Sequence, residues 1–292
     1  MIDFLSITWD VNPILFKLGP LTLRYYSILF VSGFPLGYML FIWFFKREGL
    51  DTKILEPLLY ILLLATIVGA RLGHCFFYEP QYYLAHPLEI LQPWKGGLAS
   101  HGGAIGVLIG LWIYVKKYGK KNGFDFMWLI DRLVIAVCFA GCLIRLGNLM
   151  NSEIYGNPTD LPWGFIFLRK GEIIAKHPTQ LYEAFSYLLL GFFLLGMYKY
   201  KLPKLKKGWI FGVFLIVLFG MRFLIEYIKE PQVAFENNMH LNMGQWLSVP
   251  FIIAGIIILI LSYIYNKPAM LTPQTVKKNY CPPPKQNVKT KK

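Results

Sequence analysis

Seven apolar stretches, each about as long as a membrane-spanning helix, dominate this chain of 292 residues. About 20 apolar residues cross the roughly 30 Å hydrocarbon core of a bilayer. A composition that is 55% hydrophobic and 17% aromatic also fits a polytopic membrane protein better than a soluble domain. The predicted spans are 24–45, 54–78, 98–115, 125–149, 179–198, 208–228 and 244–265. We therefore predict an all-α, polytopic integral membrane protein with seven transmembrane helices.

The basic residues predict how these helices are oriented. A net charge of +14 is compatible with nucleic-acid binding until the basic residues are located. Most of them lie in the loops after the first, third and fifth spans and in the C-terminal tail. The opposite loops and the N-terminus hold only Lys17, Arg24, Lys95, Arg169, Lys170, Lys176 and Lys229. The positive-inside rule then places the N-terminus outside and the C-terminus in the cytoplasm, so the charge indicates topology and contact with membrane lipids, with no nucleic acid as partner.

Composition divides the chain into three segments. Residues 1–23 have no removable signal peptide and are predicted to be an extracytoplasmic N-terminal segment. Residues 24–265 form the membrane domain, in which 150–178 is rich in Gly, Pro and Asn and is predicted to be a small extracytoplasmic head. Residues 266–292 are rich in Lys and Pro and are predicted to be a flexible basic cytoplasmic tail.

The cysteines and acidic residues do not indicate a metal site. Cys75, Cys138, Cys142 and Cys281 have neither metal-ligand spacing nor the pattern of a disulfide framework. The sequence contains no HExxH motif and no acidic cluster with metal-ligand spacing. We therefore expect no metal and no cofactor.

Ionisable residues inside the predicted spans gather at one face of the membrane. A charge at the bilayer centre costs about 2.5–3.5 kcal/mol on insertion scales and commonly marks a pathway or a site. A lone residue of this kind can also snorkel to water. Because the N-terminus is predicted to be outside, odd-numbered spans run inward and even-numbered spans outward, so residues from five spans meet at the outer face. They are Arg71, His101, Arg145, Glu183, Arg222 and Glu226.

Two of these residues, Arg222 and Glu226, are four positions apart. On a helix they share one face and are expected to pair, with Glu183 facing them. One interpretation is a buried structural ion pair. The other is a set of arginines that carboxylates hold while their remaining N–H groups bind phosphate, which at this depth belongs to an anionic lipid.

His101 lies in a glycine-rich segment and precedes Gly102 and Gly103. Glycine lets a backbone or a substrate approach closely, and histidine exchanges a proton near neutral pH. His101 is therefore a candidate base, and the two glycines are candidate substrate contacts. Alternatively, the histidine is a hydrogen-bonded packing residue and the glycines pack helices together.

Several motifs, in this order and spacing, resemble those of bacterial prolipoprotein diacylglyceryl transferases over about residues 10–265. They are Leu23-Arg-Tyr-Tyr, Gly69-Ala-Arg-Leu-Gly, Gly96-Gly-Leu-Ala-Ser-His-Gly-Gly, Arg145-Leu-Gly-Asn-Leu-Met-Asn-Ser-Glu-Ile-Tyr-Gly, His177-Pro-Thr-Gln-Leu-Tyr-Glu, Arg222-Phe-Leu-Ile-Glu and Met243-Gly-Gln. The resemblance implies a transferase of the bacterial cytoplasmic (inner) membrane that acts in lipoprotein biosynthesis. It would transfer diacylglycerol from phosphatidylglycerol to the lipobox cysteine in the signal peptide of a preprolipoprotein, with release of glycerol phosphate.

The resemblance also implies a set of functional residues, namely Tyr26, His101, Arg145, Asn148, Glu153, Gly156, Arg222 and Glu226. Of these, Glu153, Gly156 and Glu226 are predicted to bind the substrate, together with the arginines. In our hypothesis the two arginines bind the lipid phosphate, and Glu226 and Glu153 orient them. Asn148 and Tyr26 supply hydrogen bonds, and His101 is the base for the substrate thiol.

Some positions depart from the family's usual pattern. Lys229 stands where Arg is common and is predicted to contact the lipid, and Ser152 stands where Gly is common before Glu153. The alternative function is an anionic-lipid-binding membrane transporter. Such a protein would favour ionisable residues along the depth of the bundle and broken helices at the midplane, whereas here these residues cluster at the outer face.

Overall fold

The structure is a computed structural model that describes residues 6–19, 21–230 and 241–271. The chain divides into two compact units. The first comprises Met1–Phe44 and Ile130–Met270, and the second comprises Phe45–Leu129 and Leu271–Lys292. Most of the predicted tail, including Cys281, lies outside the described residues.

Six helical segments in the described part of the chain are long and apolar enough to cross a membrane. They are Tyr25–Arg47, Thr52–Phe77, Phe126–Met150, Thr179–Lys204, Trp209–Ile228 and Met243–Tyr265. The prediction of a helical, polytopic membrane protein is therefore confirmed.

The seventh predicted span, 98–115, corresponds to a shorter helix. This helix, α4 (Ser100–Tyr114), has 15 residues and rises about 22 Å. That length falls short of the roughly 30 Å of hydrocarbon. Helical backbone continues as a π-helix at Val115–Gly119 and as α5 (Lys120–Asn122). A count of seven spans stays a prediction.

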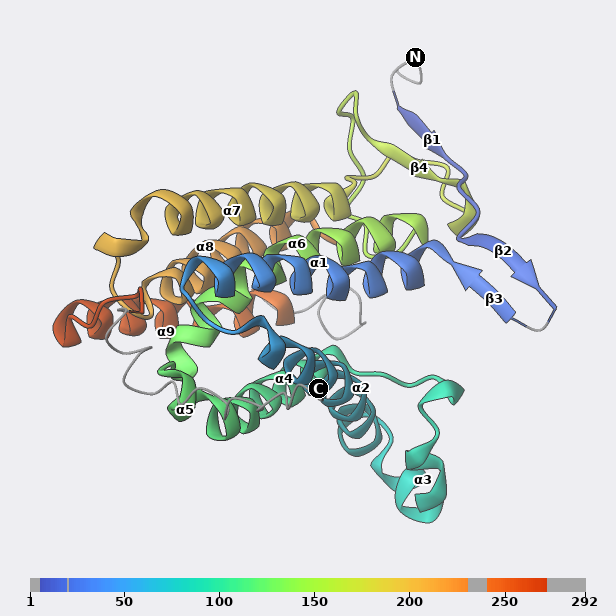
Figure 1. The fold of residues 1–292 in the computed structure, drawn as a ribbon. Helices are drawn as coiled ribbons and strands as arrows, with labels where there is room; N and C mark the ends of the chain where they lie inside the picture. The colour runs from blue at the N-terminus through green and yellow to red at the C-terminus, as the bar shows by residue number, and fades with distance from the viewer. Residues whose placement is uncertain (1–5, 20, 231–240, 272–292) are drawn as a thin grey trace, which may run out of the picture. The chain divides into compact units, whose positions relative to one another are not determined.

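The first unit is built on long helices that run side by side (Figure 1). They are α1 (Tyr25–Arg47), α6 (Phe126–Met150), α7 (Thr179–Lys201), α8 (Trp209–Ile225) and α9 (Met243–Tyr265), of which α1 and α6 extend into the second unit. Glycine lets α8 and α9 approach closely, since a Cβ atom on Gly255 would lie 2.9 Å from the Gly212 carbonyl oxygen.

Buried polar side chains define where two of these helices begin. The Asp131 carboxylate accepts hydrogen bonds from the backbone N–H groups of Gly208 (2.7 Å) and Phe211 (2.9 Å) at the start of α8. A capping box begins α9, because Asn242 Oδ1 accepts from Gln245 N while Gln245 Oε1 accepts from Asn242 N. These bonds satisfy N–H groups that have no partner inside a helix.

Four short strands, which the all-α prediction did not include, supplement the helices of the first unit. β1 (Ile7–Trp9) pairs in parallel with β4 (Phe165–Phe167), and β2 (Ile14–Leu18) forms an antiparallel hairpin with β3 (Leu21–Arg24). The Trp9 indole N–H donates to the Leu149 carbonyl at 3.1 Å. Thus the N-terminal segment folds together with the predicted head, next to the end of α6 and the start of α7 (Figure 1).

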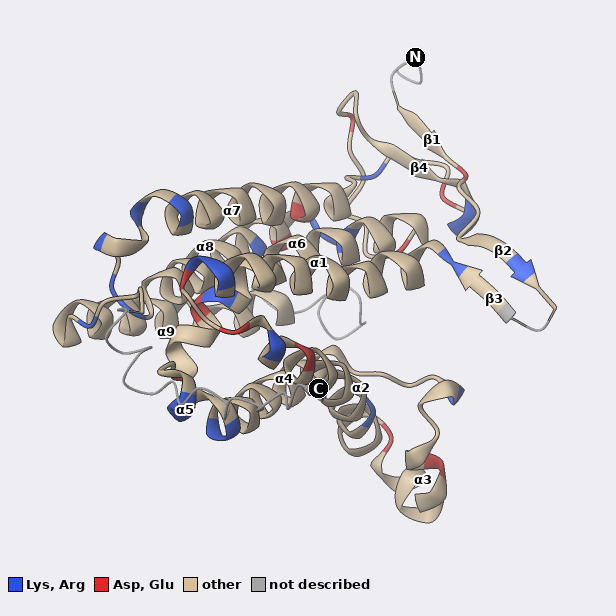
Figure 2. Cartoon of the chain, viewed as in Figure 1, with Lys and Arg blue, Asp and Glu red and all other residues tan. Residues whose placement is uncertain are grey.

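Basic residues gather at the opposite end of the first unit. Figure 2 shows Lys and Arg at the end of α7 and on the turn that follows. The residues are Lys199, Lys201, Lys204, Lys206 and Lys207. The head and this basic turn therefore lie at opposite ends of α7, and the membrane orientation stays a prediction.

The second unit is centred on the pair formed by α2 (Leu55–Phe77) and α4. A Cβ atom on Gly73 would lie 2.7 Å from the Gly102 Cα atom, and one on Gly69 would lie 2.9 Å from the Gly106 Cα atom. The two backbones are therefore in direct contact along a glycine seam. Short helical elements follow α2: α3 (Pro80–Ala85) and the 3₁₀ turns Pro87–Leu91 and Pro93–Lys95.

Arg71 organises the segment that connects α2 to α4. Its buried guanidinium donates hydrogen bonds to the carbonyl oxygens of Glu89, Ile90, Gly96 and Gly97 and lies 4.8 Å from the centre of the Tyr83 ring. Each of the three guanidinium nitrogens thus donates to at least one backbone oxygen. Arg71 therefore holds the connecting segment together and does not belong to a set of free phosphate-binding arginines.

Candidate functional site

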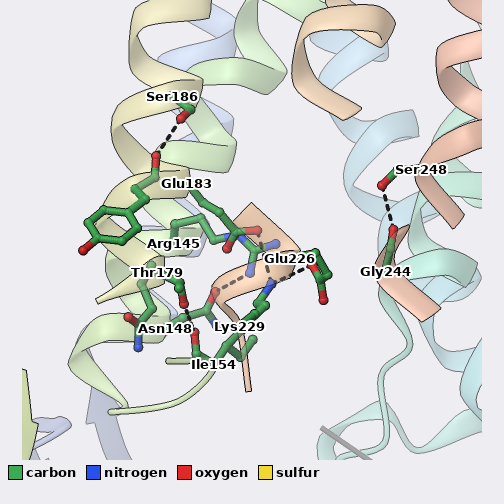
Figure 3. Close-up of polar contacts among 12 residues, drawn as sticks. Arg145, Asn148, Ile154, Thr179, Glu183, Ser186, Glu226, Lys229, Gly244 and Ser248 are labelled. Atoms are coloured by element: carbon green, nitrogen blue, oxygen red, sulfur yellow. Dashed lines mark hydrogen bonds and ion pairs between the residues drawn. The ribbon is translucent and has the colours of Figure 1, made fainter. Parts of the chain in front are cut away.

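Charged side chains from three parts of the first unit converge beside the head (Figure 3). Arg145 and Asn148 come from the last turns of α6, and Glu183 comes from the second turn of α7. Glu226 and Lys229 come from the 3₁₀ turn that follows α8 and from its C-cap. Because α6 ends where α7 begins, antiparallel helices bring these residues to one place.

Four of these side chains form a line of alternating charge. Arg145 Nε lies 3.0 Å from Glu183 Oε2, and Lys229 Nζ lies 3.3 Å from both Glu183 Oε1 and Glu226 Oε2. Glu183 is fully buried and Lys229 is 4% exposed. Leaving one member of a buried ion pair unpaired costs about 3–5 kcal/mol, so Glu183 restricts the orientation of the Arg145 guanidinium.

Asn148 connects this line to a second carboxylate. Its Oδ1 atom lies 3.4 Å from Arg145 Nη1, and its Nδ2 atom donates to Glu153 Oε1 at 2.8 Å. Asn151 Nδ2 donates to the same Glu153 oxygen at 3.2 Å. Glu153 therefore binds two amides, whereas the ion pair of Arg145 is with Glu183. The expectation that Glu153 orients an arginine is met only indirectly, through Asn148.

The turn that carries Glu153 has an unfavourable backbone conformation. Ser152 and Ile154 have positive φ angles of 51° and 62°. The left-handed region costs an L-residue about 1–2 kcal/mol, which explains why glycine suits position 152 in the family pattern. Two bonds from the first turn of α7 hold this turn: Thr179 Oγ1 donates to the Ile154 carbonyl at 2.8 Å, and Gln180 Nε2 donates to the Glu153 carbonyl at 2.7 Å.

Gly156 allows the chain after this turn to pass close to α7. Its N–H donates to the His177 carbonyl at 2.8 Å. A Cβ atom at this position would lie 2.8 Å from both His177 Cβ and Thr179 Cγ2. The glycine is therefore required for backbone packing, and its predicted contact with substrate stays a prediction.

No carboxylate of the described residues pairs with Arg222. This arginine lies half-buried in the last turn of α8 and forms no hydrogen bond or ion pair with the residues described in the structure. Arg145 and Arg222 both interact electrostatically with the buried hydroxyl of Tyr187 on α7, so the two guanidinium groups share one neighbourhood. An anion that enters this neighbourhood would meet donors from both.

The expected pair between Arg222 and Glu226 is wrong. Glu226 pairs with Lys229 instead, because α8 ends at Ile225 and Glu226 begins a 3₁₀ turn. The tighter turn moves Glu226 off the helix face that Arg222 occupies. The Glu226 carboxylate packs against Gly244, where a Cβ atom would lie 2.5 Å from Oε1.

Tyr26 is the second residue of α1 and packs against α6. A Cβ atom on Gly147 would lie 2.8 Å from Tyr26 Cδ2. Glu153 and Arg145 are close enough to the Tyr26 hydroxyl to interact with it electrostatically. The structure thus brings Tyr26, Arg145, Asn148, Glu153, Gly156, Arg222, Glu226 and Lys229 together in the first unit.

His101, Gly102 and Gly103 belong to the second unit. His101 is exposed at the second position of α4 and forms no hydrogen bond or ion pair with any described residue. Both glycines are buried, and Gly102 is part of the seam against α2. Packing alone therefore requires Gly102, and a substrate contact by either glycine stays a prediction.

The head holds a second charged cluster around Lys176. Its Nζ atom lies 3.2 Å from Glu172 Oε2 and is hydrogen-bonded to Glu230, while the Tyr155 hydroxyl donates to Glu172 Oε1 at 2.7 Å. Burial alone would lower the pKa of Lys176, but the bonds to Glu230 and Glu172 outweigh it and raise that pKa. Burial lowers the pKa of the neighbouring His177. No group of three or more His, Cys, Asp or Glu side chains is placed to hold a metal ion in the described part of the chain.

The sequence does not single out three α7 residues that the structure adds to the site: Thr179, Gln180 and Tyr187. Glu183 is recognised in the sequence only as a neighbour of Arg222. Gln180, Glu183 and Tyr187 are three and four residues apart and share one helix face, and Thr179 is four residues before Glu183. That spacing of polar residues within an apolar span is the signal that identifies them.

Comparison with known proteins shows the family of this chain. Residues 13–261 match the family described as prolipoprotein diacylglyceryl transferase. The chain is 48% identical over 254 residues to the phosphatidylglycerol–prolipoprotein diacylglyceryl transferase of Tolumonas auensis, covering 87% of this chain and 96% of the relative. It is 44% identical over 264 residues to the protein of the same name from Bacteroides fragilis, with coverages of 86% and 94%. This chain belongs to the prolipoprotein diacylglyceryl transferase family.

Proposed function

We propose that this protein transfers the diacylglyceryl group of phosphatidylglycerol to the thiol of the lipobox cysteine of a preprolipoprotein. The products are a thioether-linked lipoprotein precursor and glycerol phosphate, and the reaction is the first step of lipoprotein maturation. The observation that carries the proposal is family membership over most of the chain, in which relatives are named for this donor and this acceptor.

The phosphate of the donor binds between Arg145 and Arg222. Glu183 holds Arg145 through Nε, and Arg145 Nη1 lies 3.4 Å from Asn148 Oδ1. Arg222 has no partner of its own among the described residues. Guanidinium N–H groups match the oxygens of phosphate in geometry and charge. The line of Glu183, Lys229 and Glu226 positions this site and does not itself need to touch the lipid.

The reaction exchanges one bond at a glycerol carbon. The cysteine sulfur attacks that carbon as a thiolate, a C–S bond forms, and the C–O bond to the phosphate breaks. The bond electrons leave on the phosphate oxygen, whose developing charge the two arginines stabilise. His101 accepts the thiol proton in this proposal, because an exposed imidazole that has no partner among the described residues is available to a substrate.

In this proposal seven helices span the bacterial cytoplasmic membrane, and the site lies at its outer face. In this arrangement α4 and its π-helical continuation form the third span, the head lies outside, and the tail lies in the cytoplasm. The basic turn after α7 and the head at the other end of that helix support this orientation.

The test is an assay of the detergent-purified protein with phosphatidylglycerol and a lipobox peptide. Thioether product and glycerol phosphate should appear in equal amounts, and both should vanish when serine replaces the peptide cysteine. Arg145→Ala should lose activity while still binding the peptide. Near-normal turnover by His101→Gln would remove His101 as the base, and a protein that binds lipid without forming product would contradict the proposal as a whole.

The alternative of an anionic-lipid-binding transporter gains no support. The match to this chain covers nine-tenths or more of the length of several relatives, and these relatives are named as transferases. The charged residues of the first unit also gather beside the head, and α6 and α7 are continuous where a transporter would have broken helices.

A further inference from the structure

We propose that Glu153 is a specificity-determining residue that accepts a hydrogen bond from a hydroxyl of the lipid headgroup glycerol. This inference rests on the proposed function and identifies the part of the donor that Glu153 recognises. The sequence predicts that Glu153 orients an arginine and binds the substrate. The contacts of its carboxylate indicate which group of the substrate it binds.

The two oxygens of the Glu153 carboxylate have unequal surroundings. Oε1 accepts hydrogen bonds from Asn148 Nδ2 at 2.8 Å and from Asn151 Nδ2 at 3.2 Å. Oε2 accepts no hydrogen bond from the described residues. It is also absent from the set of buried side-chain atoms without a hydrogen-bond partner, so it is accessible. Two amides thus hold the carboxylate in one orientation, and Oε2 is an open acceptor.

The position of Glu153 fits the headgroup side of a bound phosphodiester. Asn148 lies between the two groups, with Oδ1 3.4 Å from Arg145 Nη1 and Nδ2 2.8 Å from Glu153 Oε1. Of the two ester bonds of the donor phosphate, one leads to the diacylglyceryl carbon that reacts and the other to the headgroup glycerol. A phosphate on Arg145 therefore brings the glycerol within a few bond lengths of Glu153.

The chemistry of the two partners is complementary. The headgroup glycerol carries hydroxyl donors, and a carboxylate is a strong acceptor because its bonds are charge-assisted. A site built to bind a hydroxyl rejects an analogue that lacks it, since the acceptor is then left without its bond. Glu153 would therefore favour a glycerol headgroup over an apolar one.

Backbone strain around Glu153 supports a functional role. Ser152 and Ile154, on either side, both have positive φ angles, and Ile154 is β-branched. Strain of this kind persists only where surrounding bonds impose it, as those from Thr179 and Gln180 do here. The strained turn holds the Glu153 carboxylate against Asn148, whose Oδ1 lies 3.4 Å from Arg145 Nη1.

The experiment compares phosphatidylglycerol with phosphatidylethanol, which has no headgroup hydroxyl, as donors for the purified full chain. We expect the wild type to prefer phosphatidylglycerol in kcat/KM by about 10- to 100-fold, the effect of one hydrogen bond to a charged group. Glu153→Gln should reduce this preference to about 3- to 10-fold, because a neutral acceptor gives roughly half the bond strength. Glu153→Asp, which withdraws the carboxylate by one carbon, should also reduce it.

Glu172→Gln is the matched control. Glu172 also accepts a hydrogen bond from a nearby side chain, the Tyr155 hydroxyl, but it lies in the Lys176 cluster of the head. Its donor preference should equal that of the wild type. If Glu153→Gln lowers the rates for both lipids equally, Glu153 only holds the turn and the inference is wrong.

Two further outcomes remain distinct. A wild type that uses both lipids equally well would overturn the inference but leave the proposed function intact, whereas a wild type that uses neither would overturn the proposed function. If Glu153→Gln is inactive with both donors, the rise in unfolding temperature on adding each lipid replaces the rate as the readout. A wild-type difference between the two lipids that persists in the variant would then overturn the inference.

Discussion

At the scale of single residues, substitution of Arg145 leaves a buried carboxylate without one of its cations, whereas substitution of Arg222 does not. Arg145→Gln leaves the fully buried Glu183 with one cation fewer and should lower the free energy of unfolding by about 3–5 kcal/mol. Arg222→Gln leaves no carboxylate unpaired and should change it by about 0.5 kcal/mol or less. Both should lower kcat/KM for phosphatidylglycerol by roughly 10- to 100-fold. Equilibrium unfolding in detergent and the transfer assay measure the two effects.

Arg169→Gln is the control for these variants. Arg169 forms an exposed ion pair with Asp10 at 3.0 Å, outside the arginine cluster. Exposed pairs contribute about 0–1 kcal/mol, so both stability and activity should stay near wild type. Equal destabilisation by Arg222→Gln and Arg145→Gln would show that Arg222 has a structural partner after all.

His177 makes the stability of the head depend on pH. Burial lowers its pKa in the folded protein below the usual 6.5, so the unfolded chain binds a proton more tightly. Stability is therefore fully present above about pH 6.5 and is lost as the pH falls from there to the lower folded pKa. We expect the unfolding temperature of the wild type to fall more steeply over this window than that of His177→Gln. Parallel curves would contradict this assignment.

The identities of the charged residues could be predicted from sequence, but their pairing could not. Arg145, Arg222 and Glu226 are conspicuous because ionisable residues are rare in apolar spans. The partner of Glu226 depends on whether α8 ends before or after it, and helix ends are not predictable to one residue. Because a 3₁₀ turn begins at Glu226, the carboxylate of Glu226 pairs with Lys229 and not with Arg222.

At the scale of elements, the glycine seam between α2 and α4 should tolerate no side chain. A Cβ atom on Gly73 would lie 2.7 Å from the Gly102 Cα atom, which is backbone and cannot rotate away. Gly73→Ala should therefore force the helices apart and destabilise the protein by about 1–3 kcal/mol. Thermal unfolding in detergent measures the effect.

Gly220 offers a matched substitution within a helix. A Cβ atom on Gly220 in α8 would meet no atom within 4 Å. Gly220→Ala should be neutral or stabilising by up to about 1 kcal/mol, because alanine favours helix more than glycine does. If the two alanine variants unfold at the same temperature, the seam is not as tight as the structure has it.

Long helices could be predicted from hydrophobicity, whereas the short elements could not. An apolar run such as 244–265 has no alternative to a helix in a membrane, and the observed α9 is Met243–Tyr265. β1 and β4 are three residues each and pair across more than 150 positions of sequence, so no local pattern indicates them. The Gly-Pro-Asn composition of 150–178 indicates a turn-rich segment but not its partner.

At the scale of the whole molecule, the number of membrane crossings determines where the two termini lie. Six crossings put both termini on one side, and seven put them on opposite sides. The helix that decides between them is α4, whose 15 residues continue as a π-helix. The basic residues favour seven, because the basic loops after α1, α4 and α7 and the Lys-rich tail lie on one side of the membrane only if α4 crosses it.

The native cysteines allow a direct test of this topology in spheroplasts. Cys75, Cys138 and Cys142 are buried, so Cys281 in the tail is the cysteine that a membrane-impermeant maleimide should reach, and only after the membrane is opened. Thr22→Cys, at an exposed position in β3, should react in intact spheroplasts. With Cys281→Ser as the background for the Thr22→Cys variant, each label reports one terminus. Labelling of both sites in intact spheroplasts would mean that the chain crosses the membrane six times and that α4 is not a span. It would also place the basic tail outside, which contradicts the positive-inside rule.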